Sequence, residues 1–173
     1  MKQAIVVGTA AGRSHWLADA MASLDVEVVA LSTTGFELGK IRWMYENTNF
    51  DRFIFLQDSL VIRNQQLLAK VFEAEGSACL MCEPRCLGSY LGLYERKVLD
   101  RCGIATAETK KDAIRFEVEW TAHYIAHCDS FTHPVPIHHQ MSQTVMRHGR
   151  ENLLYVNDLY EKWKGDWGQI VHQ

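Results

Sequence analysis

Three consecutive residues, Gln57, Asp58 and Ser59, combine an amide, a carboxylate and a hydroxyl directly after an apolar run. The run, Phe53–Leu56, has the composition of a buried strand. In an open α/β sheet, ligands bind in the crevice outside the carboxyl ends of the strands. We therefore expect Asp58 to face solvent, a metal or a substrate. An acid that starts a turn or caps a helix would give the same pattern.

A second acid, Glu117, falls within a long helix that the sequence predicts from about residue 111 to 128. At about 100° per residue, Glu117 lies near the middle of a broad apolar face. An ionised carboxylate against a core is costly unless it is paired or exposed to a cleft. Glu117 is thus either a functional acid or half of a structural ion pair. The expected apolar face comprises Ala113, Ile114, Val118, Thr121, Tyr124, Ile125 and Cys128, and the expected solvated face carries Arg115, Glu119 and His123.

Small residues between Gly8 and Gly12 connect the first expected strand to the first expected helix, with Arg13 following. Such a loop lets backbone approach a nucleotide, and a helix N-terminus favours anions. The loop is not GxGxxG and lacks the GK[ST] ending of a P-loop, so neither a dinucleotide oxidoreductase nor a P-loop kinase is supported. A plain tight turn explains it equally well.

Lys162 and Lys164 flank Trp163 near the end of the chain. Two cations around an aromatic ring could bind a diphosphate or another acidic partner. The same pattern is typical of an amphipathic tail anchored by its tryptophan.

Several residues of metal-binding type are better explained without a metal. Cys79 and Cys82 lie three apart in a strand-like run, so they point to opposite faces, and buried thiols are the favoured interpretation. Glu119, His123 and His127 have the spacing i, i+4, i+8, which can bind a metal on one helix face but more often belongs to a solvated face. His138 and His139 are adjacent in an extended segment, so only one of them could point into a site. The remaining residue considered is Cys86.

Strand and helix patterns alternate through the first half of the chain. This order predicts an α/β fold with a mostly parallel sheet flanked by helices. The length of 173 residues suits one domain. The tail from Glu151 begins with a helix-like run. The expected strands are 3–7, 26–31, 52–57 and 78–82, and the expected helices are 13–24, 37–47, 64–75, 95–101 and 111–128.

Composition narrows the class of protein. A formal net charge of −3 gives no strong nucleic-acid signal, although a local basic patch stays possible. No apolar run approaches the roughly 18–20 residues that cross a bilayer, and the N-terminus has the pattern of a strand rather than a signal peptide. Five cysteines, an odd number, favour a reducing cytoplasm over a secreted disulfide scaffold.

In their order along the chain, these segments resemble the GT-A type glycosyltransferases, which use nucleotide-sugar donors. The resemblance covers about residues 3–168. It is closest to small members in which an aromatic-rich strand ends in a single Asp-Ser. The matching segments are 5–9, Gly35–Gly39 opening a helix, Phe55–Ser59, Gly88–Glu95 with the helix that follows to Gly103, Phe116–Glu119 and Lys162–Gly165.

The resemblance implies roles for particular residues. Asp58 stands where the family's DxD motif holds a divalent metal, Mn²⁺ or Mg²⁺, and the donor diphosphate; Gln57-Asp58-Ser59 supplies one carboxylate instead of two. Glu117 would be the general base, and His139 or His138 would complete the metal shell. The implied donor site comprises Gly8, Thr9, Arg13, Glu37, Gln57, Asp58, Ser59, Lys162 and Lys164, and the implied sugar and acceptor pocket Gly88, Ser89 and Tyr90.

The predicted function is transfer of a sugar from a nucleotide-diphosphate sugar to a hydroxyl acceptor, with inversion. Residues 1–83 would form the nucleotide-binding half, and residues 84–173 the acceptor half. A non-catalytic domain that binds nucleotide sugars or acts as a scaffold is the alternative. A nucleotidyltransferase on a related sheet is a third possibility, because the first loop partly fits that class.

Overall fold

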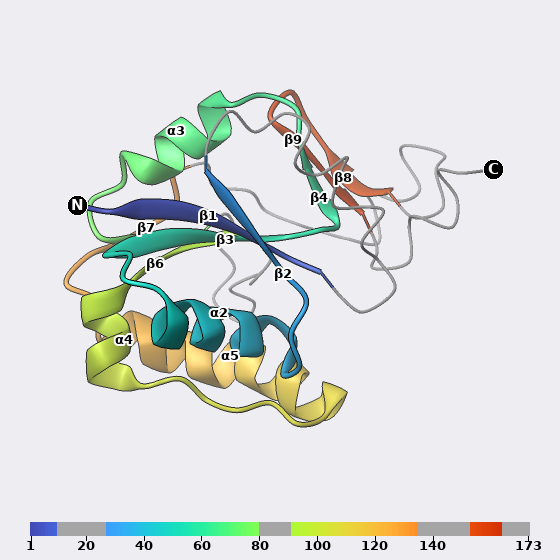
Figure 1. Ribbon diagram of the computed structural model, residues 1–173. Helices are drawn as coiled ribbons and strands as arrows, with labels where there is room; N and C mark the ends of the chain where they lie inside the picture. The colour runs from blue at the N-terminus through green and yellow to red at the C-terminus, as the bar shows by residue number, and fades with distance from the viewer. Residues whose placement is uncertain (10–26, 80–90, 135–152, 164–173) are drawn as a thin grey trace.

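A computed structural model describes residues 1–9, 27–79, 91–134 and 153–163. Its main sheet has six strands in the order β2-β1-β3-β6-β5-β7 (Figure 1). β1 pairs in parallel with both β2 and β3, and β5 pairs in parallel with β7. β6 is antiparallel to both of its neighbours. The strands are β1 (Gln3–Gly8), β2 (Val28–Leu31), β3 (Arg52–Gln57), β5 (Ser77–Cys79), β6 (Leu91–Glu95) and β7 (Phe131–Thr132).

All strands of this sheet except β6 therefore run in one direction, which confirms the predicted mostly parallel α/β fold. β1 and β3 end together, because Gly8 is paired with Gln57. The residues that follow these two strands, Thr9 and Asp58, are thus brought to the same edge of the sheet. That edge is where a doubly wound sheet opens a crevice for ligands.

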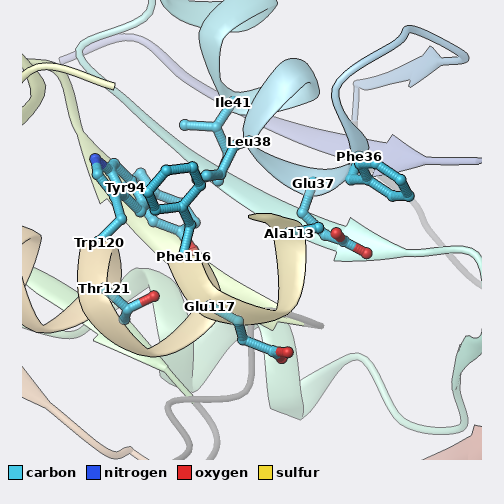
Figure 2. A pocket seen from close by; sticks show the side chains of 10 residues that line it. All are labelled: Phe36, Glu37, Leu38, Ile41, Tyr94, Ala113, Phe116, Glu117, Trp120 and Thr121. Carbon is cyan, nitrogen blue, oxygen red and sulfur yellow. The ribbon is translucent and has the colours of Figure 1, made fainter. Parts of the chain in front are cut away.

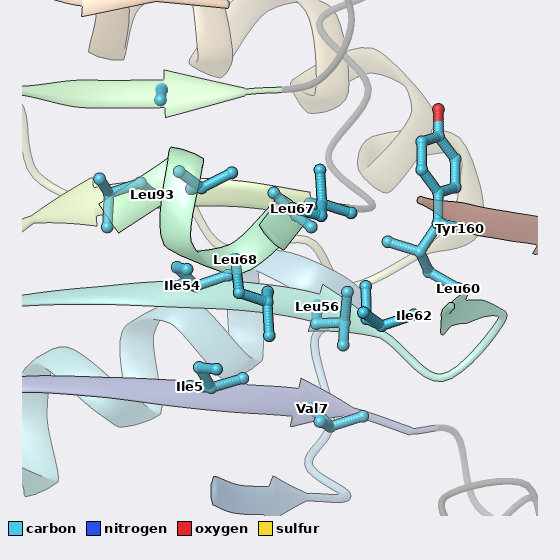
Figure 3. Packing of buried hydrophobic residues seen from close by; sticks show 13 residues of the cluster. Ile5, Val7, Ile54, Leu56, Leu60, Ile62, Leu67, Leu68, Leu93 and Tyr160 are labelled. Atoms are coloured by element: carbon cyan, nitrogen blue, oxygen red, sulfur yellow. The ribbon is translucent and has the colours of Figure 1, made fainter. Parts of the chain in front are cut away.

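Helices cover both faces of the main sheet (Figure 1). β3 shows why, because its side chains alternate between two apolar clusters. Phe53 and Phe55 pack with α2, α4 and α5, whereas Ile54 and Leu56 pack with α3 (Figure 3). A strand that is apolar on both faces needs this double cover. The helices are α2 (Phe36–Asn47), α3 (Gln66–Phe72), α4 (Arg96–Cys102) and α5 (Lys110–Ala126).

A second, antiparallel sheet has the order β4-β9-β8, formed by β4 (Leu60–Ile62), β8 (Leu153–Val156) and β9 (Tyr160–Trp163). The helix-like interpretation of the tail is therefore wrong over residues 153–163. The Asn157 side chain accepts hydrogen bonds from the backbone amides of Leu159 and Tyr160, which closes the β8–β9 turn. β9 is then held by β4, about a hundred residues away, and such non-local pairing overrides local propensity.

The buried face of α5 agrees with the predicted one at Thr121, Tyr124, Ile125 and Cys128 and differs from it nearer the start of the helix. Ile114 and Val118 are 60% and 42% exposed, so their assignment to the core is wrong. Trp120, which the periodicity did not select, is buried with Tyr124, and the two rings lie 5.4 Å apart. The bulk of these rings rotates the buried stripe toward residues 116, 120 and 124. The expected exposure of Arg115, Glu119 and His123 is confirmed.

The helix expected at residues 13–24 lies outside the described part of the chain. In the described residues, no helix is both long enough and apolar enough to span a membrane.

Candidate functional site

A cleft of about 350 Å³ opens at the carboxyl edge of β1 and β3. Residues from α2, α5 and β9 complete its walls, so segments distant in the sequence meet there. It contains both acidic and basic side chains. Its lining residues are Gly8, Thr9, Phe36, Glu37, Lys40, Phe55, Gln57, Asp58, Ser59, Lys110 and Lys162.

Asp58 lies at the base of the cleft and is only 4% exposed. Its backbone N–H donates to the carbonyl of Gly8 at 3.0 Å, which extends the β1–β3 ladder by one step. The hydroxyl of Thr9 donates to Asp58 Oδ2 at 2.7 Å. A buried carboxylate needs such a partner, because desolvating an isolated charge is costly. The structure thus brings Thr9 and Asp58 together, as expected for a shared site.

Gln57 joins three elements through its side-chain amide. Its Nε2 donates to Glu37 Oε1 on α2 at 2.7 Å, and its Oε1 accepts from Lys162 Nζ on β9 at 2.8 Å. Lys162 Nζ also donates to Ser59 Oγ at 2.6 Å. The backbone amide of Trp163 donates to the carbonyl of Ser59 at 2.8 Å, which fixes β9 beside this turn. The predicted donor residues from three distant segments therefore form one hydrogen-bonded group.

Lys40 and Lys110 line the same cleft and were not singled out from the sequence. Lys40 is only 6% exposed, and its Nζ donates to the carbonyl of Phe36 at 3.0 Å. Burial lowers the pKa of Lys40, and the charges of Glu37 and Asp58 oppose this shift. The sequence did contain a sign that Lys40 is unusual. Lys40 lies one residue before Ile41 and four residues before Met44, so it falls beside the apolar stripe of the predicted helix. A lysine in that position is unusual unless it is paired or functional.

Glu117 lines a neighbouring pocket rather than the cleft itself. This pocket lies between α2 and α5, and Figure 2 shows the Glu37 and Glu117 carboxylates arising from these two helices. Phe36 and Glu37 line both spaces, so the pocket and the cleft adjoin. α5 is continuous through this region, so the helical placement of Glu117 is confirmed.

Aromatic side chains form the inner wall of the Glu117 pocket. Tyr94 lies 6.2 Å from Trp120, measured between ring centroids. Burial raises the pKa of Tyr94 well above its usual range, and nearby acidic groups, Glu117 and Glu37 among them, add to the shift. The phenol therefore stays protonated at neutral pH. Phe116 completes this apolar wall.

The described ranges contain no group of three or more His, Cys, Asp or Glu side chains that could hold a metal ion. Of the residues that the structure describes, Asp58 and Glu37 are the carboxylates that line the cleft. The Cys79 side chain is buried, as predicted, with Sγ 3.5 Å from His133 Nδ1. On α5, His127 Nδ1 lies 2.8 Å from the carbonyl of His123, which suits a helix end rather than a metal site.

Several predicted site residues lie outside the described part of the chain, so their placement relative to the cleft stays a prediction. They are Arg13, Cys82, Cys86, Gly88, Ser89, Tyr90, His138, His139 and Lys164.

Comparison with known proteins gives a limited likeness. No protein-family model matches the chain, and no curated protein matches it. Among solved structures, a protein from STIV is 16% identical, with a TM-score of 0.41 over 58% of this chain and 68% of that one.

Two enzymes show a similar degree of likeness. A mannosyltransferase from Pyrobaculum calidifontis, in complex with GDP-Man and Mn²⁺, is 10% identical, with a TM-score of 0.46 over 60% of this chain and 47% of that one. The catalytic domain of a Drosophila β1,4-galactosyltransferase 7, in complex with xylobiose, is 12% identical, with a TM-score of 0.43 over 59% of this chain and 52% of that one. The present chain spans about half the length of these two enzymes.

Proposed function

We propose that the protein transfers a sugar from a nucleotide-diphosphate donor to a hydroxyl acceptor. One observation supports this most directly: Asp58, Glu37 and three lysines meet in one cleft at the carboxyl edge of β1 and β3. Among the described residues of the cleft, three lysines lie with two carboxylates, which suits an anionic ligand. A diphosphate has that charge, and it is the group that leaves during sugar transfer.

The chemistry assigns distinct tasks to the two sides of the site. The acceptor oxygen attacks the anomeric carbon, and the bond from that carbon to the diphosphate oxygen breaks. Negative charge then grows on the diphosphate, and fixed cations aimed at it stabilise the transition state. Lys162 and Lys40 are positioned for this, because they reach the cleft from β9 and α2. The acceptor proton passes to a general base, for which we propose Glu117.

The residues in the cleft also fit a divalent cation. Mg²⁺ and Mn²⁺ prefer oxygen ligands, and Mg²⁺ is commonly held by one or two carboxylates together with substrate phosphates. Asp58 would provide the first carboxylate, and Glu37 lines the same cleft. We propose His139 as a further ligand. The cation, when bound, would neutralise charge on the diphosphate.

The placement of Glu117 favours a second candidate, a domain that binds nucleotide sugars without transferring them. Its carboxylate belongs to the adjoining pocket and not to the cleft. A base must come within about 3 Å of the proton that it removes. In this alternative the cleft binds the donor, and no acceptor reaches Glu117.

A screen of UDP-, GDP-, dTDP- and CMP-sugars distinguishes the two candidates. Transfer or donor hydrolysis that is lost in Glu117→Gln, with donor affinity retained, supports the enzyme. Donor binding without turnover under any acceptor condition supports the binding module. Glu119→Gln is the matched control, because Glu119 lies on the same helix and is exposed. Absence of binding for every donor would reject both candidates.

We propose a single domain in which residues 1–83 bind the nucleotide and residues 84–173 supply acceptor contacts. Lys162 is an exception to that division, since it reaches the donor side of the cleft. We propose a reducing cytoplasm as the protein's location, with which the free thiols Cys102 and Cys128 are consistent.

A further inference from the structure

We infer that Phe36 is the platform on which the sugar ring of the donor stacks. The inference rests on the proposed function and adds a binding residue that recognises the sugar rather than the phosphates. The backbone conformation of Phe36 is unusual. Phe36 has φ 57°, the one positive φ at a non-glycine residue in the described part of the chain. A bulky residue in this region is an outlier, and such strain tends to persist at functional positions.

Neighbouring groups hold the strained turn in place. Lys40 Nζ donates to the carbonyl of Phe36 at 3.0 Å and lies 3.5 Å from the carbonyl of Thr33. Gly39 packs directly under the turn, since a Cβ at position 39 would lie 1.8 Å from the carbonyl oxygen of Thr34. These contacts hold the backbone of the turn in its strained conformation.

The Phe36 ring is not buried in the hydrophobic core. Phe36 is 38% exposed, whereas Tyr94 and Trp120 on the inner wall are 5% and 6% exposed. Figure 2 shows the Phe36 ring standing apart from these two rings. Exposing a phenylalanine while straining its backbone has no evident benefit to folding. The arrangement is explained if a ligand covers the ring.

The position of the ring identifies the part of the ligand that it would meet. Phe36 lines both the cleft, which holds Asp58 and Lys162, and the pocket that holds Glu117. In the proposed reaction the phosphates occupy the cleft and the base acts from the pocket. The transferred sugar must lie between them, at the boundary that Phe36 forms. The C–H face of a pyranose ring is apolar and suits an aromatic surface, whose contacts favour burial.

The test compares each nucleotide with its sugar conjugate. Calorimetry would measure Kd for UDP and UDP-glucose, and for GDP and GDP-mannose, in the parent and in Phe36→Gly, Phe36→Leu and Phe36→Trp. Glycine accepts positive φ without strain, so Phe36→Gly should keep or raise Tm while removing the platform. Ile114→Ala on α5 is the control, because Ile114 is exposed and lines neither space.

We expect Phe36→Gly and Phe36→Leu to weaken binding of the nucleotide sugar by roughly 3- to 10-fold. They should leave binding of the plain nucleotide unchanged, and Phe36→Trp should retain the parent's preference for the conjugate. Equal weakening of nucleotide and conjugate would mean that the ring contacts the nucleoside, and unchanged affinities would mean that it contacts no ligand; either result overturns the inference and leaves the proposed function standing. Failure of the parent to bind any of the four probes would overturn the inference, and failure to bind dTDP- and CMP-sugars as well would overturn the proposed function.

Discussion

The hydroxyl of Thr9 donates a hydrogen bond to Oδ2 of Asp58 across 2.7 Å, linking residues 49 positions apart in the chain. Each residue immediately follows a strand, β1 and β3, that ends in register with the other. The carboxylate is therefore held by the sheet and not by a mobile loop. This bond orients one carboxylate oxygen and fixes the acid at the base of the cleft, where it can meet a cation or repel an anion.

Replacing Asp58 by asparagine should change phosphate binding in opposite directions with and without metal. With Mn²⁺ present, loss of the carboxylate should weaken nucleoside diphosphate binding at least about tenfold, because charged ligands to the metal are lost. In EDTA, removal of a negative charge beside Lys40 should strengthen binding by a few-fold. Titration calorimetry under both conditions checks this.

Asp51→Asn serves as the control for that experiment, because Asp51 is an exposed carboxylate just before the start of β3, at the other end of that strand. A decrease in affinity for Asp58→Asn in EDTA as well as in Mn²⁺ would contradict a metal-binding role for the acid.

The lowered pKa of Lys40 predicts a pH-dependent affinity for phosphates. Burial lowers this pKa, and Glu37 and Asp58 partly restore it. As pH rises through the folded-state pKa, Lys40 loses its proton and its attraction for anions, so binding of inorganic pyrophosphate should weaken. In Lys40→Arg, affinity should persist to higher pH, because arginine stays charged. Pyrophosphate titrations between pH 7 and 10 measure the difference.

The lowered pKa of Lys40 also makes the free energy of unfolding depend on pH, and the direction of that dependence follows from the shift. Between the lowered pKa and the ordinary lysine pKa of 10.5, the unfolded chain binds more protons at Lys40 than the folded chain does. The free energy of unfolding should therefore gain a positive contribution from Lys40 as pH rises through that window.

The control for the pyrophosphate titrations is Lys110→Met, at an exposed residue of the cleft, which should lower affinity for pyrophosphate without moving the pH midpoint. Identical pH profiles for the parent and Lys40→Arg would count against the assignment.

The Gln57 bridge predicts a coupling between Gln57 and Glu37. Gln57→Glu places a second carboxylate where an amide N–H donated to Glu37 Oε1 at 2.7 Å. Like charges at this distance should lower the free energy of unfolding by about 1–3 kcal/mol. Adding Glu37→Gln restores a donor and acceptor pair, so the double variant should recover most of the loss.

Urea denaturation of the four proteins in that cycle gives the coupling energy. Strictly additive effects would show that the two side chains do not interact in solution.

Gly39 is predicted to be essential for the turn that carries Phe36. Alanine is normally favoured over glycine within a helix by about 1 kcal/mol. At position 39, however, a Cβ would lie 1.8 Å from the carbonyl oxygen of Thr34. Gly39→Ala should therefore destabilise the fold by at least about 2 kcal/mol, in the range of severe overpacking.

Gly103 provides the comparison, because it has φ 68° but a Cβ added there would meet no other atom of the described residues within 4 Å. With ψ 178°, Gly103 adopts an extended positive-φ conformation that is almost exclusive to glycine, so Gly103→Ala should cost only that backbone strain, about 1–3 kcal/mol, with no added clash. Thermal unfolding of both variants tests the order, and a more stable Gly39→Ala protein would show that the turn relaxes.

Local patterns identified the parts of the fold that short-range physics governs. Apolar strand composition predicted β3 to its final residue, and 3.6-residue spacing predicted α2 and α5 to within about two residues. The abrupt change from Leu56 to Asp58 pointed to the edge of the sheet where the cleft is found.

Long-range packing determined the features that local patterns did not predict correctly. The β8–β9 hairpin was mistaken for helix, because its stability depends on pairing with β4 near residue 61. The buried face of α5 was predicted only in part: Thr121 and Tyr124 are buried as expected, whereas Ile114 and Val118 are exposed and Trp120 packs in the core instead.

What the sequence by itself determined is the alternation of strands and helices and the acid at the end of β3, since both follow from residue type and spacing within a few neighbours. Only the tertiary structure decided that Lys40 joins that acid, and that Phe36 stands exposed between the cleft and Glu117. The physical reason is that charge compensation and ring exposure depend on distances between segments far apart in the chain, and no local pattern encodes those distances.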